Sequence, residues 1–145
     1  MAKVSTYLNF AGNTEQAFTF YKAAFQSEFD GAIRRYGDMP AQPGQPPMPD
    51  EMRRMVMHIE LPILGGHLLM GTDAPESMGF SVKHGNGVWL SLDPDSRAEA
   101  DRLFAALGEG GTVEMPLAEM FWGGYFGTLA DRFGVRWMVN CTAKL

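Results

Sequence analysis

The stretch YLNFAGNTEQAFTFYKAAF, residues 7–25, passes from a strand pattern into a helix pattern and decides the fold. β-branched and aromatic residues in partial alternation predict a strand over residues 3–10. Gly12 breaks that strand, and the Asn-Thr pair after it offers an N-cap. Apolar residues then recur at helical spacing, which predicts an amphipathic helix over residues 14–25.

Three more strands are expected in the first half of the chain, over residues 29–36, 54–64 and 67–72. The Gly65-Gly66 pair between the last two is a tight-hairpin signal. Residues 37–50 contain five prolines and two glycines, which exclude a regular element. A loop of this length inside a domain is either a functional lid or disordered, and the sequence leaves both open.

The second half of the chain repeats this order of elements. A strand at 87–92 precedes a helix that follows the N-cap Ser96, and three strands come after it, at 112–115, 124–129 and 135–141. The two helices can be laid over each other so that apolar residues meet apolar residues: Ala17 meets Ala100, Phe20 meets Leu103, and Tyr21 meets Phe104.

This repeat predicts an α+β fold in a single domain, 1–145, made of two β-α-β-β-β modules at about 1–75 and about 85–145. Two half-sheets of four strands can close edge to edge. The helices then cover the outer faces, and the inner faces enclose a cleft.

Charge and composition exclude several classes of partner. The net charge is −5, and no basic stripe is present, so neither nucleic acid nor an anionic membrane is expected as a partner. No apolar run approaches the roughly 20 residues of a membrane helix. The first ten residues lack a signal-peptide pattern, and the single Cys141 excludes an internal disulfide, so a cytoplasmic location is expected. Eleven methionines suit a core or an adaptable binding surface.

Three stretches together resemble a known family: residues 7–25, MHIELPILGGHLLMGTD at 57–73, and FWGGYFGTLADRFGVRWMVN at 121–140. They are similar to the PhnB-like branch of the vicinal oxygen chelate superfamily, which includes glyoxalase I, extradiol dioxygenases and bleomycin resistance proteins. The resemblance implies paired βαβββ modules that form a curved mixed sheet around a cleft. It also implies a homodimer.

Metal enzymes of that superfamily hold one divalent ion with side chains from the first and last strand of each half. The resemblance places the four ligand positions at Thr6, Met70 or alternatively Leu68, Val88 and Met138. A register slip of one residue would offer Tyr7 and Val139 and would change the face. None of these offers the imidazole or carboxylate that such an ion prefers, since a thioether is a soft ligand. We therefore expect no metal site and no cofactor.

Two other groups of residues suggest chemistry. His58 and Glu60 lie two apart on one strand and share a face, so the pair could bind a metal or move a proton, or His58 could simply be hydrogen-bonded in the fold. Trp122 and Tyr125 flank two glycines, which suits either a hydrophobic ligand with a polar end or a dimer seam. If Val88 and Met138 face the cleft, the tryptophans beside them, Trp89 and Trp137, face the helices.

The function that the sequence favours is metal-free binding of a small apolar molecule in the cleft. The residues expected to contact it are Thr6, His58, Met70, Val88, Trp122, Tyr125 and Met138. One alternative is a divalent-metal enzyme of the lyase, isomerase or dioxygenase type whose ligands are displaced to His58 and Glu60. Another is a metal-free enzyme with His58 as its base. A quinone methyltransferase is least favoured, because no glycine-rich cofactor loop is visible.

Overall fold

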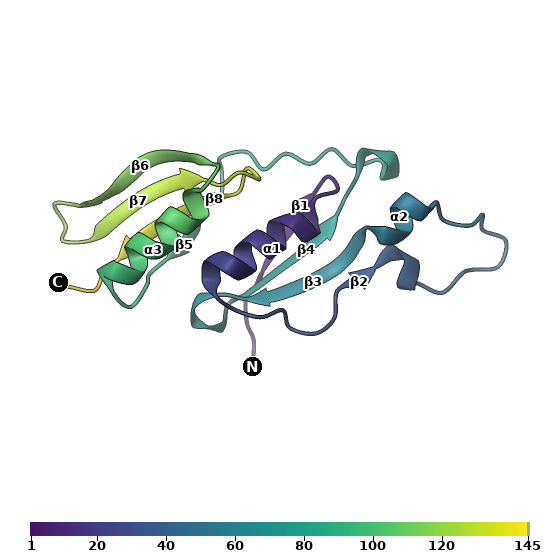
Figure 1. The fold of residues 1–145 in the computed structure, drawn as a ribbon, viewed down its shortest axis with the longest axis horizontal. Helices are drawn as coiled ribbons and strands as arrows, with labels where there is room; N and C mark the ends of the chain where they lie inside the picture. Colours follow the sequence, from purple (N-terminus) through teal and green to yellow (C-terminus); the bar gives the residue numbers. More distant parts are fainter. Residues whose placement is uncertain (145) are drawn as a thin grey trace. The chain divides into compact units, whose positions relative to one another are not determined.

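The computed structural model describes residues 1–144, and the chain divides into an N-terminal unit, Met1–Val82, and a C-terminal unit that begins at Lys83. Each unit has one four-stranded sheet and one long helix (Figure 1). The boundary between Val82 and Lys83 lies between the two predicted modules. Within residues 1–144, no helix has both the length and the apolar character needed to cross a membrane.

The N-terminal unit is built around a sheet of order β1-β4-β3-β2, in which β1 runs parallel to β4 and the other neighbours are antiparallel. Its elements in chain order are β1 (Thr6–Phe10), α1 (Thr14–Phe25), β2 (Arg34–Arg35), η1 (Tyr36–Asp38), α2 (Asp50–Arg54), β3 (Val56–Pro62), η2 (Leu64–Gly66), β4 (Leu68–Asp73) and η3 (Glu76–Met78).

The C-terminal unit has the equivalent sheet order, β5-β8-β7-β6, with β5 parallel to β8. Its elements are β5 (Leu90–Leu92), α3 (Arg97–Gly108), β6 (Thr112–Glu119), β7 (Tyr125–Ala130) and β8 (Arg136–Cys141). Strand, helix and three strands therefore occur twice in the same spatial order. The predicted α+β class and the repeat of the βαβββ plan are confirmed.

Several predicted elements differ in extent from the observed ones. The strand expected at 29–36 shrinks to the two residues of β2, and the chain then turns into η1. The strand expected to start at residue 54 begins at Val56, because α2 occupies Asp50–Arg54. Residues 39–49, between η1 and α2, form a long loop with no regular element, which we call the proline-rich segment (Figure 1).

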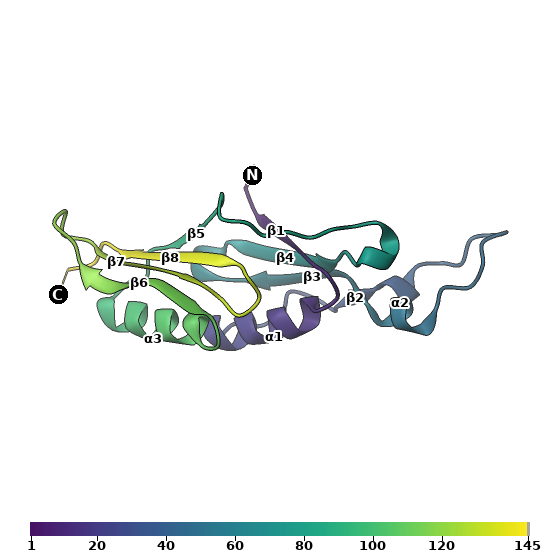
Figure 2. The same cartoon turned by 90° about the horizontal axis from the view of Figure 1, so that it is seen from above.

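In each unit the helix packs on one face of its own sheet, as Figure 2 shows. Phe18 and Tyr21 of α1 are fully buried there, and Phe18 lies directly over Gly71 of β4. Leu103 of α3 and Trp137 of β8 are fully buried in the other unit. Burial of these apolar faces is the main source of stability for such a layered fold.

A buried aspartate joins helix to sheet in the N-terminal unit. Asp73 Oδ1 accepts hydrogen bonds from Thr14 N at 3.0 Å and Thr14 Oγ1 at 2.6 Å, and its Oδ2 accepts one from Val56 N at 2.8 Å. It therefore caps α1 from a distant strand, while Asn13 makes no side-chain cap.

Candidate functional site

We call the face of each sheet that points away from its helix the open face of that unit. In β3 and β4 the residues that point toward α1 are buried, as Ile59 and Leu69 illustrate. Side chains alternate between the two faces of a strand. His58 and Glu60 therefore lie on the open face of the N-terminal unit, and so does Met70, the registered partner of Glu60.

Strand β1 contributes a different residue to this open face than the sequence predicts. Its register with β4 pairs Tyr7 with Met70 and Thr6 with Leu69, so Tyr7 shares the open face and Thr6 does not. The Thr6 hydroxyl instead lies 2.8 Å from Nε2 of His67. The prediction of Thr6 beside Met70 is wrong by one residue, and a slip of one residue always changes the face.

His58 has a polar contact on each side of its ring. Its Nε2 lies 2.9 Å from Glu60 Oε1, and its Nδ1 lies 3.5 Å from the Tyr7 hydroxyl, with the two ring centroids 5.8 Å apart. If Nε2 carries the proton and donates to Glu60, Nδ1 is free to accept a hydrogen bond from Tyr7. A histidine oriented by a carboxylate and touching a hydroxyl is an arrangement that can move a proton.

The donors on this open face do not fit the single divalent ion of the superfamily's metal enzymes. Met70, which offers only a thioether, stands between Tyr7 and Glu60 in the register of the sheet. His58 Nε2 and Glu60 Oε1 are already bonded to each other. Within residues 1–144, no three His, Cys, Asp or Glu side chains gather as they would around a metal ion.

The open face of the C-terminal unit carries Met138. It registers with Ser91 and Thr128, whereas Trp137 registers with Leu90 and is fully buried on the α3 side. The predicted opposite orientations of Trp137 and Met138 are therefore observed.

The predictions for the adjacent residues Val88 and Trp89 are corrected. Val88 precedes β5 and is 76% exposed, so it is not part of a strand face. The guanidinium of Arg136, two residues before Met138, lies 5.3 Å from the Trp89 ring. Because Arg136 and Met138 share a face, Trp89 lies beside the open face and not against α3.

Trp122 and Tyr125, which the sequence groups together, lie on different sides of the sheet. The Tyr125 hydroxyl donates to Asp101 Oδ1 of α3 at 2.5 Å, and this hydrogen bond raises the pKa of Tyr125 above its usual value. The Trp122 ring packs at 5.8 Å and 74° on Phe126, which registers with Asn140 on the open face. Tyr125 therefore ties β7 to the helix, and Trp122 covers the open face.

Two of the open-face residues that matter most, Phe126 and Asn140, are missed by the sequence analysis, and Tyr7 enters it only through a register slip of one residue. For Asn140 a signal exists, because it lies two residues after Met138 and must share its face. For Phe126 the signal is its cross-strand position opposite Asn140, which appears only once the hairpin register is known. For Tyr7 the signal is strand alternation: Phe10 is buried, so position 9 lies on the opposite face, and Tyr7, two residues earlier, lies on that face as well.

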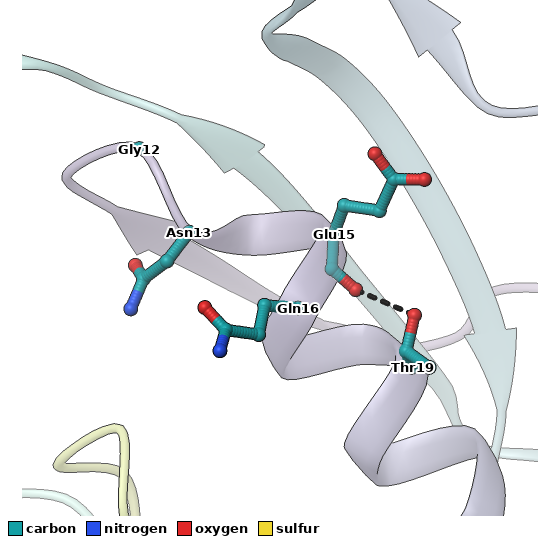
Figure 3. Close-up of a pocket in the computed structure, with 5 residues that line it drawn as sticks. All are labelled: Gly12, Asn13, Glu15, Gln16 and Thr19. Atoms are coloured by element: carbon teal, nitrogen blue, oxygen red, sulfur yellow. Dashed lines mark hydrogen bonds between the residues drawn. The ribbon is translucent and has the colours of Figure 1, made fainter.

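Depressions of the surface also occur away from both open faces. One, of about 460 Å³, lies at the start of α1 and is lined by Gly12, Asn13, Glu15, Gln16 and Thr19 (Figure 3). There the Thr19 hydroxyl donates to the backbone oxygen of Glu15. Another, of about 410 Å³, is formed by the proline-rich segment with Tyr36 and Arg53. No predicted site residue lines either depression.

Comparisons with known proteins agree with this architecture. A family model described as 3-demethylubiquinone-9 3-methyltransferase matches residues 2–140. Protein YjdN of Escherichia coli is 34% identical over 142 residues, which cover 94% of this chain and 93% of that protein.

Solved structures extend the comparison to the fold. The crystal structure of protein PA1353 from Pseudomonas aeruginosa is 38% identical, with a TM-score of 0.80 and coverage of 97% of this chain and 98% of that chain. A PhnB protein from Bacillus cereus is 28% identical, with a TM-score of 0.68 and coverage of 97% and 99%. A glyoxalase/bleomycin resistance protein/dioxygenase family enzyme from Burkholderia phytofirmans, 21% identical with a TM-score of 0.64 and coverage of 95% and 98%, shares the fold.

Proposed function

This chain belongs to the family described as 3-demethylubiquinone-9 3-methyltransferase and shares the fold of a glyoxalase/bleomycin resistance protein/dioxygenase family enzyme, and on that premise we propose that it binds a small, largely apolar molecule without a metal ion. The observation that supports this proposal is the aromatic and thioether surface on the open face of the C-terminal unit. Trp122 is 52% exposed there, and Phe126 and Met138 are half-buried. Accessible apolar side chains with a few polar groups are typical of ligand sites.

Methyl transfer, which the family description names, has less support from this chain. Nucleotide-type cofactors are usually held by a glycine-rich turn between a strand and a helix. Here the turn between β1 and α1 is Ala11-Gly12-Asn13, with a single glycine. We therefore do not propose a methyltransferase activity.

A thermal-shift screen of apolar compounds tests the binding proposal, because a ligand that binds only the folded protein raises its Tm. Hits should lose most of their shift in a Met138→Gln variant. They should keep it in Met39→Gln, which alters an exposed methionine far along the chain in the proline-rich segment. Equal loss in both variants, or no hits at all, would contradict the proposal.

Elemental analysis of the purified protein tests the metal-free part. The metal-dependent alternative places a divalent ion at His58 and Glu60. One transition-metal ion per chain, lost in His58→Ala, would establish that alternative and overturn the metal-free proposal. We expect no stoichiometric metal in either protein.

A second candidate function is metal-free proton transfer with His58 as the base. The contacts of His58 with Glu60 and Tyr7 favour it, since a general base needs an orienting partner and access to a proton. Turnover of electrophilic or carbonyl compounds by the wild type, lost in His58→Ala while ligand binding is kept, would establish this function. A His58→Ala variant with unchanged turnover would exclude it.

We also propose that the protein is a homodimer, and its cytoplasmic location remains a prediction from the sequence. Phe121 is 97% exposed beside Trp122, and large exposed aromatics are enriched at interfaces. Size-exclusion chromatography with light scattering should give twice the 16.0 kDa mass of the chain. A clean monomer at all concentrations would contradict this proposal.

A further inference from the structure

A buried hydrogen-bond acceptor on the open face of the C-terminal unit lacks a donor. Oδ1 of Asn140 is shielded from solvent, and within residues 1–144 no hydrogen bond reaches it. Such groups are few in native proteins, because burial removes water without replacing its hydrogen bond. An orphaned acceptor on a face already suited to ligands indicates a partner that is not part of the chain.

The Trp122 indole lies near this acceptor. A Cβ atom added to Gly124 would lie 2.5 Å from Nε1 of Trp122 and 2.8 Å from Oδ1 of Asn140. The indole N–H and the amide oxygen thus approach the same point, yet no hydrogen bond joins them. Only a glycine at position 124 leaves room for both groups.

The indole is also held in a way that permits it to move. Trp122 is 52% exposed and is followed by Gly123, which has a φ of +89° that favours glycine. Its ring contacts are with two other aromatic rings, Phe121 at 5.0 Å and Phe126 at 5.8 Å. Displacement of the indole would uncover both the Phe126 ring and the Asn140 amide, which are registered partners in the sheet.

We propose that Asn140 Oδ1 accepts a hydrogen bond from the O–H or N–H group of a neutral aromatic ligand, whose ring replaces the Trp122 indole against Phe126. This inference rests on the proposed function and names the class of ligand. Like the indole, such a ligand has an aromatic ring and one hydrogen-bond donor. Unlike the indole, it is not attached to the chain, so its donor can turn toward Asn140 Oδ1 and form the hydrogen bond that the indole does not form.

The charges on the same face favour a neutral ligand. Arg136 Nη1 donates to Glu114 Oε1 at 2.5 Å, so these two opposite charges neutralise each other. Neither is left to attract an ionised ligand. A phenol or an aromatic amine therefore fits better than a carboxylate.

A pair of matched probes, 4-propylphenol and 4-propylanisole, tests the inference by titration calorimetry on the full chain. The two differ in that the methyl ether cannot donate a hydrogen bond. We expect the phenol to bind about tenfold more tightly, as one added hydrogen bond to a buried acceptor should give. In Asn140→Leu the preference should disappear while the anisole still binds.

The outcomes separate this inference from the proposed function. Equal affinity of the two probes for the wild type would overturn the role of Asn140 and leave apolar binding intact. Binding of neither probe, with an empty thermal-shift screen, would remove the proposed function as well. Asn140→Leu should also unfold at a higher temperature than the wild type, because it removes a buried unpaired acceptor.

A second variant keeps the test decisive if Asn140→Leu does not fold. Trp122→Ala removes the ring that must be displaced, so 4-propylphenol should bind it more tightly than it binds the wild type. Weaker binding by Trp122→Ala would mean that the indole is part of the ligand site, which overturns the displacement. Tryptophan emission provides a further readout: a phenol-induced change should occur in the wild type and be absent in Trp122→Phe.

Discussion

The two open faces belong to the same β-sheet plan but carry different chemistry. On the N-terminal unit Tyr7, His58 and Glu60 form a line of polar contacts. On the C-terminal unit Trp122 and Phe126 form an aromatic surface over a buried amide. The helix-facing sides are apolar in both. The two units thus share an apolar helix-facing side, while the open face carries polar contacts in one unit and an aromatic surface in the other.

The same comparison applies to the way each unit secures its strands. Asp131 Oδ1 accepts hydrogen bonds from Phe133 N and Val135 N, and its Oδ2 accepts one from Trp137 Nε1 at 2.8 Å. Asp73 has the same pattern, with two donors on Oδ1 and one on Oδ2. Asp131 follows β7, whereas Asp73 is the last residue of β4. The two units therefore place the same hydrogen-bonding pattern at different positions of the sheet.

Removing either aspartate gives the largest expected effect. Asp73→Ala removes the acceptor of three buried hydrogen bonds, and Asp131→Ala removes the acceptor of two buried hydrogen bonds and one part-buried bond. Each substitution should lower the free energy of unfolding by about 3 kcal/mol or more. Urea denaturation followed by far-UV circular dichroism measures this for both. Asp95→Ala, at an exposed position of the C-terminal unit, is the control and should change stability by less than about 0.5 kcal/mol.

A glycine under α1 gives the next largest effect. A Cβ at Gly71 would lie 2.5 Å from the Phe18 ring, closer than atoms can approach. Gly71→Ala should therefore lower the free energy of unfolding by about 2 kcal/mol through overpacking. In the C-terminal unit the position equivalent to Gly71 is Val139, which follows Met138 as Gly71 follows Met70. There the strand itself contributes a side chain to the core, whereas in the N-terminal unit Phe18 of the helix fills that space.

Gly87→Ala is the matched control for Gly71→Ala. No atom lies within 4 Å of the Cβ it would add, and its φ is not in the left-handed region. The same substitution should therefore leave stability nearly unchanged. If both alanine variants unfold at the same denaturant concentration, close packing of Phe18 on β4 is not what requires the glycine.

The helix N-caps provide a smaller contrast. Ser96 accepts a hydrogen bond from Glu99 N at 3.1 Å, as the sequence predicts for α3, whereas Asn13 makes no such bond for α1. Ser96→Ala should lower the free energy of unfolding by about 1 kcal/mol, and Asn13→Ala should have almost no effect. A large loss in Asn13→Ala, measured by thermal unfolding, would show that Asp73 is not the cap of α1.

Local patterns predict much of this fold. The helix at 14–25 is found as α1 because its apolar residues repeat with a helical period over three turns. The repeat of elements is also visible in the sequence. The five-residue helix α2 is missed because a single turn has too few residues to show a period. The cap of α1 is missed because its acceptor, Asp73, is far away in the sequence.

The candidate site is predicted less well, because it depends on register. His58, Met70 and Met138 lie on open faces as expected, and whether they contact a ligand stays a prediction. The family resemblance predicts Thr6 as a cleft residue. Alternation counted back from the buried Phe10 instead puts Thr6 on the face that packs on the helix. Tyr125 is separated from Trp122 because the turn at Gly123 and Gly124 turns Trp122 back over the sheet, a bend that composition does not reveal.

Acid pH should produce the smallest contrast between the units. Arg35 donates to both oxygens of Glu15, at 2.9 and 3.1 Å, and joins β2 to α1, whereas Arg102 pairs with Glu99 within α3. Both arginines hold the glutamate pKa below its ordinary value of 4.5, chiefly by hydrogen bonding. A lowered folded-state pKa stabilises the protein above about pH 4.5, and that contribution is lost as the pH falls through the folded-state value.

Glu15→Gln and Glu99→Gln separate these two contributions. At neutral pH each should cost less than about 1 kcal/mol, because both pairs are exposed to solvent. Glu15→Gln should lower the free energy of unfolding more than Glu99→Gln. The Arg35–Glu15 pair joins β2 to α1, whereas the Arg102–Glu99 pair lies within α3. Below the folded-state pKa both variants should match the wild type in urea denaturation. A difference that persists at acid pH would mean that the glutamates stabilise the fold by packing and not by charge.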